Sequence, residues 1–362
     1  MKRIISVIIA FCLINIACLC GCGEPDIVAV SPTEGASVAL VNDSMLRFVQ
    51  NYELGSSDRY VSFKDNFAPK EIELSWTAEG EAKDFEIEVS TNFDFKNAER
   101  FRTTESKLIL EELLVNYTYY WRVRAIYDDG ESLSEVFTFN TENTPRTIKI
   151  NGVSNTRDIG GKNTSSGKRV KQKMAYRGAY LDEIGEIGRE KALGFYDIKT
   201  DLDLRREAEG TAGSGSPLGE DVQYINYSCP YYLGGNGIDS YENQANLASA
   251  IKVFADEKNY PIYFHCSVGR DRTSMIAMLI LGLLGVSETD ICIDYETSAF
   301  SYRGTMDKAS MDDMARAFSN TMGYILMATG ERDFDDACEA FLLSIGVSGS
   351  EIASIRAIML ED

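Results

Sequence analysis

Histidine is almost absent from this chain, and its scarcity excludes several classes of site. His265 is the only histidine among 362 residues. A metal centre built mainly from imidazoles therefore cannot form, and a Ser-His or Cys-His nucleophile pair is excluded everywhere except beside residue 265. From the sequence we expect neither a metal nor another cofactor.

The cysteines are too irregularly placed to suggest a disulfide framework. Three of the eight lie in an apolar N-terminal stretch and a fourth ends it, which leaves four for the folded part: Cys229, Cys266, Cys292 and Cys338. Their wide spacing fits neither paired disulfides nor a zinc site. No Cys-x-x-Cys pair occurs among these four, which argues against a thiol redox protein.

Positive charge is also in short supply. Lys and Arg number 36 against 56 Asp and Glu, which gives a net charge of −20. This balance argues against nucleic acid or an anionic membrane surface as the main partner, and it requires any phosphate site to be locally basic. The length is sufficient for two hydrophobic cores, so we expect two domains.

The N-terminus has the pattern of an export signal. Met1-Lys2-Arg3 is positive and is followed by an apolar run too short to be read first as a membrane span. Leu19-Cys20-Gly21-Cys22 resembles a bacterial lipobox, which implies a signal peptide over residues 1–21 and lipid on Cys22. We therefore expect a linker over residues 22–31 and lipid anchoring in a bacterial cell envelope, periplasmic or at the cell surface. The alternatives are an ordinary signal peptide or an uncleaved anchor.

Residues 32–143 predict an all-β sandwich. Apolar and polar residues alternate in several short runs, such as Ile72, Leu74 and Trp76, and turn formers separate the runs. The run over residues 119–125, with Gly130 after it, resembles a fibronectin type III domain. Such a domain is either a binding module or a stalk without a specific ligand, because the sandwich fold does not imply one.

From residue 147 to residue 362 the pattern predicts an α/β domain with a central, mostly parallel sheet flanked by helices. We expect strands near 147–150, 198–204 and 222–226, and helices near 187–193 and 243–256. A further helix is expected to begin after Ser287 as its N-cap. The small-residue loop at 210–219 is a candidate cover for a site.

The stretch from residue 262 to residue 284 predicts a buried strand, a tight loop and a buried helix. Residues 262–264 are apolar β-formers, whereas residues 274–284 form a long apolar run almost free of β-branching. The loop between them lies at the carboxyl end of a strand and the amino end of a helix. There, helix N–H groups and the positive end of the helix dipole favour a bound anion.

The side chains of this loop suit phosphate chemistry. Beside the helix N–H groups and Arg272, Cys266 is expected to have a lowered pKa and to be a thiolate at neutral pH. Arg272 can hold two phosphoryl oxygens with its planar fork, and Gly269 lets the backbone turn its N–H groups inward. Thr273 can place a hydroxyl near the Cys266 sulfur.

The pattern His265-Cys266-x-x-Gly269-x-x-Arg272-Thr273 resembles the phosphate-binding loop of the cysteine-based tyrosine phosphatases. The resemblance implies that Cys266 attacks phosphorus, forming a phosphocysteine intermediate, while Arg272 and the loop N–H groups hold the phosphoryl oxygens without a metal. It implies that His265 orients the nucleophile. It assigns phosphate binding to the residues around them: Ser267, Val268, Gly269, Arg270 and Thr273.

Two further motifs, at residues 155–161 and 174–179, resemble a bacterial group of mostly secreted tyrosine and phosphoinositide phosphatases. With them the resemblance spans about residues 148–360. We expect Arg157 and Asp158 to satisfy the backbone and each other, a direct catalytic role being the alternative. Arg177 is expected either to extend a basic rim or to be a surface charge.

The residue that protonates the leaving group is open between two aspartates. The larger tyrosine phosphatases use an aspartate in a Trp-Pro-Asp loop, and this chain has no such tripeptide. Asp271, inside the loop, matches an acidic position of the bacterial group, and Asp203 lies at the end of a predicted strand. We prefer Asp271, the alternative being that it only orients the neighbouring arginines.

The substrate class is open as well. The bacterial group often has Lys at the position of Arg270, which is associated with extra phosphates of inositol lipids, and Arg keeps the charge but changes the shape. We expect phosphotyrosine proteins as substrates, with phosphoinositides or inositol phosphates as the alternative. A different class of function is a cell-surface binding protein with a degenerate phosphatase domain. The oligomeric state is not indicated by the sequence.

Overall fold

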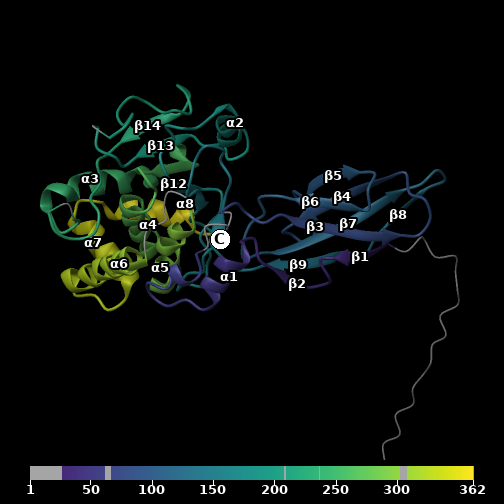
Figure 1. Cartoon of the computed structure of the whole chain (residues 1–362), viewed down its shortest axis with the longest axis horizontal. Coiled ribbons are helices and arrows are strands. Elements are labelled where there is room, and N and C mark those ends of the chain that lie inside the picture. Colours follow the sequence, from purple (N-terminus) through teal and green to yellow (C-terminus); the bar gives the residue numbers. More distant parts are fainter. Residues whose placement is uncertain (1–26, 62–66, 208, 236, 302–307, 362) are drawn as a thin grey trace, which may run out of the picture.

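The computed structural model describes residues 27–61, 67–207, 209–235, 237–301 and 308–361, and the predicted signal peptide and Cys22 lie outside these ranges. The chain forms an elongated β-lobe next to a rounder α/β lobe (Figure 1). Within the described ranges, no helix combines the length and the apolar character needed to cross a membrane.

The β-lobe consists of two sheets that share one core. The first sheet has the order β1-β3-β6, and the second has the order β2-β9-β7-β4-β5, with β8 paired to β7. The bounds are β1 (Ile27–Ser31), β2 (Ala36–Val38), β3 (Ile72–Ala78), β4 (Asp84–Ser90), β5 (Glu99–Thr103), β6 (Lys107–Leu110), β7 (Thr118–Ile126), β8 (Glu131–Leu133) and β9 (Phe137–Thr141).

The alternation of buried and more exposed residues explains how these strands pack. Along β7 every second residue is buried, and Trp121 meets Trp76 of the opposite sheet with 6.3 Å between ring centroids. The strands predicted at residues 72–76 and 119–125 are therefore confirmed. The likeness to fibronectin type III domains stays a prediction.

One segment of the predicted all-β region is helical and leaves the β-lobe. Helix α1 (Asp43–Gln50) and the short helix η1 (Ser57–Arg59) lie between β2 and β3. Asn42 caps α1 by accepting a hydrogen bond from the Met45 N–H. Met45 and Phe48 then share a core with Ile293 and Phe300 of the α/β lobe, so this part of the chain braces the second lobe.

The α/β lobe is built on a six-stranded sheet with the order β10-β11-β12-β15-β13-β14. The first two pairings are antiparallel and the other three are parallel. The bounds are β10 (Arg146–Thr147), β11 (Arg157–Asp158), β12 (Ala175–Gly178), β13 (Thr200–Asp203), β14 (Gln223–Asn226) and β15 (Ile262–His265). The predicted mixed sheet of mostly parallel strands is confirmed.

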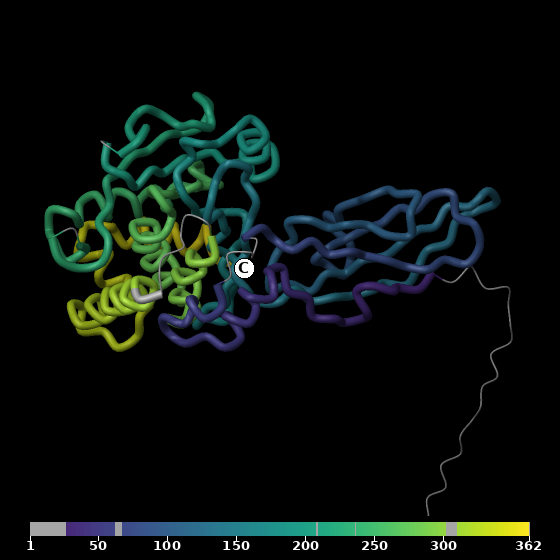
Figure 2. The backbone as a smooth tube through the Cα atoms, in the orientation of Figure 1, coloured from purple at the N-terminus to yellow at the C-terminus, as the bar shows by residue number. Residues whose placement is uncertain are grey.

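Helices surround the sheet in the rounder lobe (Figure 1 and Figure 2). They are α2 (Glu186–Gly194), α3 (Tyr241–Lys252), α4 (Asp271–Leu283), α5 (Glu288–Thr297), α6 (Lys308–Thr329), α7 (Phe334–Ser344) and α8 (Gly349–Met359), with short turns η2 (Val253–Ala255), η3 (Glu257–Asn259) and η4 (Ser298–Phe300). The predicted N-cap is confirmed, because the Ser287 side chain accepts a hydrogen bond from the Asp290 N–H.

Helix α4 is the centre of this lobe. All residues from Thr273 to Leu283 are buried, which explains its apolar sequence. Gly282 lets α7 approach closely, since a Cβ there would lie 2.5 Å from the Cys338 sulfur. The helix is thus fixed on several sides, and its amino end is held at the edge of the sheet.

Buried and partly buried contacts join the two lobes. Arg146, 2% exposed, donates from Nη1 to Asp158 Oδ2 at 2.8 Å and from Nη2 to the Glu112 carbonyl at 3.0 Å. Arg169 stacks over the Tyr117 ring and pairs with Glu361 at 2.7 Å. These contacts hold the β-lobe against the edge of the α/β sheet that begins at β10.

Candidate active site

The predicted anion loop occupies residues 266–270, between β15 and α4. Strand β15 lies between β12 and β13, so the loop leaves the middle of the parallel part of the sheet. Gly269 has φ +70°, and a Cβ there would lie 2.2 Å from the Gly178 carbonyl carbon. Only glycine fits this turn without moving the backbone of β12.

Cys266 stands at the first position of the loop and is 2% exposed. Arg272, on the first turn of α4, donates from Nη2 to the hydroxyl of Ser267, the residue next to Cys266, at 3.2 Å. Burial acts to lower the pKa of Arg272, but Glu209 and the charge on Cys266 together raise it. The loop therefore brings the predicted nucleophile and the predicted phosphate clamp together.

A carboxylate that the sequence analysis did not identify occupies the clamp. Arg272 Nη1 donates to Glu209 Oε1 at 2.9 Å and Arg272 Nη2 donates to Glu209 Oε2 at 2.7 Å. The Ser267 hydroxyl donates to Glu209 Oε2 at 3.0 Å. Two anionic oxygens are thus held by a guanidinium fork and a loop hydroxyl, the donors that a phosphoryl group also needs.

Asp271 lies at the first position of α4 and is partly exposed. Arg270 Nε donates to Asp271 Oδ1 at 3.0 Å, and the Tyr232 hydroxyl is 2.5 Å from the same oxygen. Arg270 therefore contacts Asp271 directly, and Arg272 interacts with Asp271 through its charge. The side chain of this candidate for the general acid is 20% exposed.

Asp203, the other candidate, is completely buried. Its carboxylate accepts from the Arg205 N–H at 2.9 Å, from Arg205 Nη2 at 2.8 Å and from the Tyr224 hydroxyl at 3.0 Å. Burial acts to raise the pKa of Asp203, but Arg205 and the charge of His265 outweigh it and lower the pKa below its usual range. Such a carboxyl is poorly suited to deliver a proton.

His265 is held by two carboxylates beneath the loop. Its Nε2 lies 2.9 Å from Asp201 Oδ1, and its Nδ1 lies 3.9 Å from Asp203 Oδ1. Burial acts to lower the pKa of His265, but Asp201 and Asp203 raise it above 6.5. The ring cannot act as a base toward substrate, since it is 1% exposed, and it instead fixes the strand end that carries Cys266.

The two additional motifs hold the loop from below. The Asn155 side-chain amide donates to the Val268 carbonyl at 2.9 Å, and Arg177 Nη2 donates to the Gly269 carbonyl at 2.8 Å. The expectation that Arg177 extends a basic rim or lies on the surface is wrong, because the residue is fully buried. Its guanidinium instead ties β12 to the back of the loop.

Asp294 of α5 binds the arginines of both motifs. It accepts from Arg157 Nε at 3.0 Å and from Arg177 Nη1, and Lys162 Nζ lies 3.9 Å away. Burial acts to raise the pKa of Asp294, but these cations lower it strongly. The expected pairing of Arg157 with Asp158 is wrong: Arg157 pairs with Asp294, and Asp158 pairs with Arg146.

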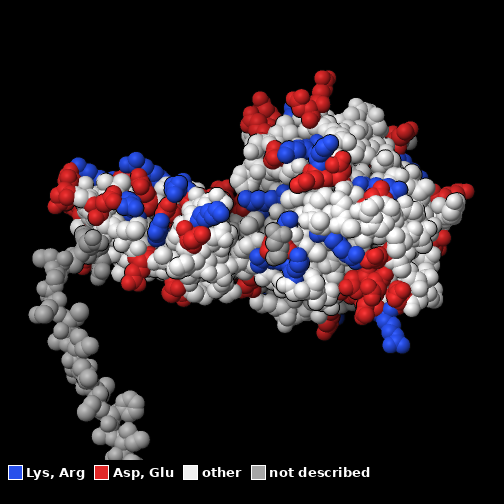
Figure 3. Space-filling model, turned by 180° about the vertical axis from the view of Figure 1, so that it is seen from behind, with Lys and Arg blue, Asp and Glu red and all other residues white. Residues whose placement is uncertain are grey.

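Thr273 is buried on the first turn of α4, and its hydroxyl has no hydrogen-bond partner among the described residues. Its approach to the Cys266 sulfur stays a prediction. Within the described ranges, no group of three or more His, Cys, Asp or Glu side chains could hold a metal ion. Figure 3 shows acidic and basic side chains interspersed over both lobes on the face that it displays.

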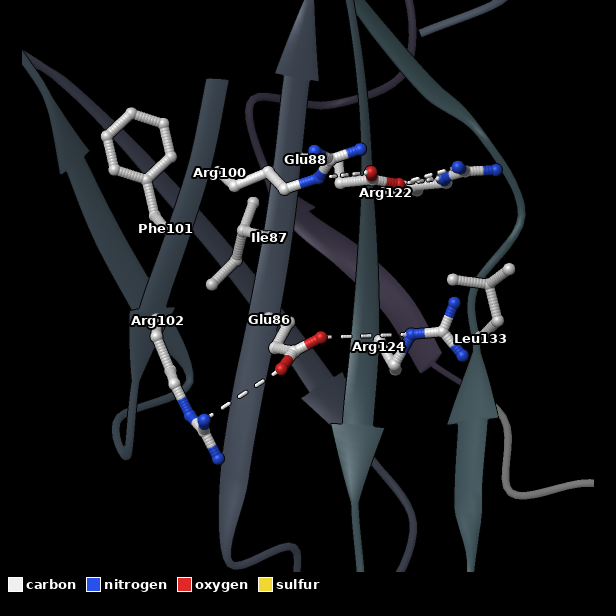
Figure 4. Close-up of a pocket in the computed structure, with 9 residues that line it drawn as sticks. All are labelled: Glu86, Ile87, Glu88, Arg100, Phe101, Arg102, Arg122, Arg124 and Leu133. Carbon is white, nitrogen blue, oxygen red and sulfur yellow. Dashed lines mark hydrogen bonds and ion pairs between the residues drawn. The ribbon is translucent and has the colours of Figure 1, made fainter. Parts of the chain in front are cut away.

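The surface hollows of the β-lobe are separate from this loop. One of about 380 Å³ lies over β4, β5 and β7, where Glu86 and Glu88 pair with arginines of the neighbouring strands (Figure 4). Glu88 accepts from Arg100 Nε at 3.0 Å and from Arg122 Nε at 2.6 Å. These cross-strand pairs, with two arginines on each glutamate, support the sheet.

Comparison with known proteins finds a family match over the α/β lobe. A family model described as "Tyrosine phosphatase family" matches residues 148–361. A "Putative tyrosine-protein phosphatase" of Cupriavidus necator is 24% identical over 173 residues, which cover 41% of this chain and 61% of that protein. A "Tyrosine-protein phosphatase" of Nostoc commune is 26% identical over 215 residues, covering 50% of this chain and 72% of the relative.

Among solved structures, the core catalytic domain of the PP-IP phosphatase SIW14 from S. cerevisiae, in complex with citrate, is similar with a TM-score of 0.30. It has 18% sequence identity and covers 43% of this chain and 88% of that chain. A second structure of the Siw14 catalytic core has a TM-score of 0.25 and 15% identity, covering 39% of this chain and 85% of that chain.

Proposed function

Because the chain belongs to the tyrosine phosphatase family, we propose that it hydrolyses phosphate monoesters, phosphotyrosine first among them, through a phosphocysteine at Cys266. The observation that carries the proposal is the binding of Glu209. Arg272 and Ser267 already hold a pair of anionic oxygens at the mouth of the loop. With Arg272 fixed in this way, its Nε edge and the loop N–H groups are the donors for the oxygens of a phosphoryl group.

In the first displacement the Cys266 sulfur forms a bond to phosphorus and the bond from phosphorus to the ester oxygen breaks. Arg272 and the N–H groups of the loop stabilise the charge on the phosphoryl oxygens. Asp271 gives its proton to the leaving oxygen, since Asp203 is buried and held by Arg205.

In the second displacement a water oxygen bonds to phosphorus and the sulfur–phosphorus bond breaks. Asp271, now a carboxylate, takes the proton that the water loses. Inorganic phosphate leaves and Cys266 is again a thiolate. No metal ion is needed for either step, because the positive charge comes from Arg272 and the amino end of α4.

Arg270 bears on the choice between phosphotyrosine and inositol phosphates. Its side chain is 11% exposed and its Nε is engaged by Asp271. An arginine held in this way is poorly placed to reach a second phosphate, which favours a substrate with one phosphate. Higher turnover on inositol polyphosphates than on phosphotyrosine peptides would show that the alternative substrate class is the correct one.

The test of the proposed reaction uses p-nitrophenyl phosphate and the protein from residue 23 onward. We expect hydrolysis by the natural sequence and none above background by Cys266→Ser. Cys338→Ala is the matched control, because Cys338 is a buried thiol of α7 that packs against Gly282 and not against the loop. Full activity of Cys266→Ser would remove Cys266 as the nucleophile.

We also propose that the protein is anchored by lipid on Cys22 in a bacterial cell envelope, with the β-lobe as a fibronectin type III-like spacer. The lipobox-like sequence at residues 19–22 supports the anchor. Fractionation of cells that produce the full chain and Cys22→Ser tests this proposal. We expect the first in the membrane fraction and the second released from it.

A further inference from the structure

A tyrosine from the loop after β14 contacts the carboxylate of Asp271. The Tyr232 hydroxyl lies 2.5 Å from Asp271 Oδ1 and 2.6 Å from the Tyr295 hydroxyl of α5. Tyr232 is 8% exposed and Tyr295 is 3% exposed, so both hydroxyls are shielded from bulk water. Three segments that are distant in sequence therefore meet in one short chain of hydrogen bonds beside the loop.

The direction of these hydrogen bonds follows from the chemistry of the groups. Whether or not Oδ2 carries a proton, Asp271 Oδ1 can only accept, so Tyr232 donates to Asp271. A phenol has one proton, and Tyr232 must then accept the hydrogen bond from Tyr295. The two tyrosines thus point their donors in sequence toward Asp271 and hold its side chain in one orientation.

The contacts also distinguish the two oxygens of Asp271. Oδ1 accepts from Tyr232 and from Arg270 Nε, whereas Arg270 Nη2 is 3.4 Å from Oδ2. Oδ1 is therefore used to fix the side chain. Among the described residues, Oδ2 has only the long contact from Arg270. It is the oxygen that can exchange a proton with a substrate.

The backbone conformation at Tyr232 is strained, which indicates that placing its side chain beside Asp271 costs free energy. Its φ is +55°, in the left-handed region that disfavours residues with a Cβ. The loop nevertheless holds this conformation, with the Ile238 N–H donating to the Tyr232 carbonyl at 2.9 Å and the Gly237 N–H donating to the Gly234 carbonyl at 2.7 Å. Glycine or asparagine would relieve the strain but could not reach Asp271.

We propose that Tyr232, supported by Tyr295, is a positioning residue that aims Asp271 Oδ2 at the leaving oxygen. The inference rests on the proposed function. In the first displacement the bond between Oδ2 and its proton breaks as the ester oxygen takes the proton, and Tyr232 stabilises the carboxylate that forms. In the second, Oδ2 takes a proton from water, and the tyrosines keep their own protons throughout.

The test compares two substrates that depend differently on the general acid. p-Nitrophenolate leaves readily without a proton, whereas phenolate, from phenyl phosphate, has a basicity near that of tyrosine and needs one. The variants are Tyr232→Phe, Asp271→Asn and the two combined, with Tyr231→Phe as the control. Tyr231 is the half-buried neighbour of Tyr232 and takes no part in the chain of hydrogen bonds to Asp271.

We expect Asp271→Asn to lose about 100-fold in kcat/KM on phenyl phosphate and much less on p-nitrophenyl phosphate. Tyr232→Phe should lose roughly tenfold on phenyl phosphate, again with a smaller loss on the other substrate, because a general acid that is present but poorly aimed retains part of its effect. In the Asp271→Asn background, removing the Tyr232 hydroxyl should change neither rate further. Tyr231→Phe should match the natural sequence.

Three results would overturn the inference. Tyr232→Phe could lower kcat/KM equally on both substrates, it could lower kcat/KM by the same factor in the Asp271→Asn background, or it could leave kcat/KM unchanged. Should Tyr232→Phe fail to fold, Tyr295→Phe is expected to show the same selective loss at smaller size, and its absence would overturn the inference equally. Cys266→Ser, assayed alongside, reports on the proposed function separately. If that variant turns over substrate, the reaction scheme itself is wrong, whatever the tyrosines do.

Discussion

Glu209 and Arg272 form a two-point ion pair across the mouth of the loop, with Nη1 to Oε1 at 2.9 Å and Nη2 to Oε2 at 2.7 Å. The pair engages both terminal nitrogens of the Arg272 guanidinium, Nη1 and Nη2. In the described part of the chain, Ser267 is its other hydrogen-bond partner, at 3.2 Å from Nη2. The Nε edge of Arg272 is thereby left for phosphoryl oxygens.

Glu209 is expected to keep Arg272 in its working orientation. We predict that Glu209→Ala lowers kcat/KM for p-nitrophenyl phosphate by about tenfold or more, because an unfixed guanidinium must be ordered when substrate binds. Glu209→Gln, which keeps one acceptor oxygen, should lose less. Steady-state kinetics with inorganic phosphate as a competing inhibitor measure both effects.

The matched control is Glu207→Ala, an exposed glutamate two residues away on the same segment. It should retain full activity. A rise in kcat/KM for Glu209→Ala would contradict the prediction and would mean that Glu209 competes with the phosphoryl group for the clamp.

The buried cluster around Asp294 makes a prediction about stability. Asp294→Asn leaves Arg157 and Arg177 inside the protein without a compensating charge. We expect the free energy of unfolding to fall by about 3–5 kcal/mol, the usual cost of breaking a buried ion pair from one side. Urea denaturation followed by circular dichroism measures this difference.

Glu288→Gln makes the same carboxyl-to-amide change at an exposed position on the same helix and should cost about 0.5 kcal/mol. A loss for Asp294→Asn as small as that of the control would show that the cluster does not hold α5 and the loop together. The comparison therefore separates a buried structural charge from an ordinary helix-end charge.

The raised pKa of His265 makes a prediction about pH. The protonated ring is favoured in the folded protein because Asp201 and Asp203 outweigh the effect of burial. Its contribution to stability is fully present below the unfolded-state pKa of about 6.5 and is lost as the pH rises through the folded-state pKa. The free energy of unfolding should therefore decline as the pH rises above about 6.5.

His265→Asn should remove most of this decline, so that the two stability curves converge toward higher pH. Chemical denaturation at several pH values measures the difference between the two proteins. A difference that stays constant or grows toward alkaline pH would contradict the assignment of a raised pKa to His265.

Local features of the site could be read from neighbouring residues. The strand at Ile262–His265 and the helix from Asp271 followed from an apolar β-forming run next to an apolar helical one. Ser287 was recognisable as an N-cap because the capping group and the N–H that it accepts are three residues apart. In each case the physical cause lies within a few residues of its effect.

Contacts between distant segments could not be read in the same way. Glu209 meets Arg272 across 63 residues, and Tyr232 meets Asp271 across 39. Nothing in a single sequence tells that a glutamate just before a small-residue loop folds onto a helix end. The only signal was its place just after the strand that carries Asp203, where functional groups of α/β proteins gather.

Charge was the most misleading guide. Arg177 was expected at a basic rim or on the surface, and Arg157 was expected to pair with Asp158. Both are buried, because Asp294 on a helix more than 100 residues away compensates them. Helix α1 was missed for a different reason. It interrupts an otherwise all-β region, although the Asn42 cap and the spacing of Met45 and Phe48 carried its signal.

The most direct measurement is the covalent state of Cys266 during turnover. The protein from residue 23 onward is mixed with an aryl phosphate, quenched within the first turnover and digested, and its peptides are weighed by mass spectrometry. The account predicts one phosphoryl group on Cys266, absent from Cys266→Ser. A phosphoryl group on any other residue, or turnover of substrate by Cys266→Ser, would contradict it.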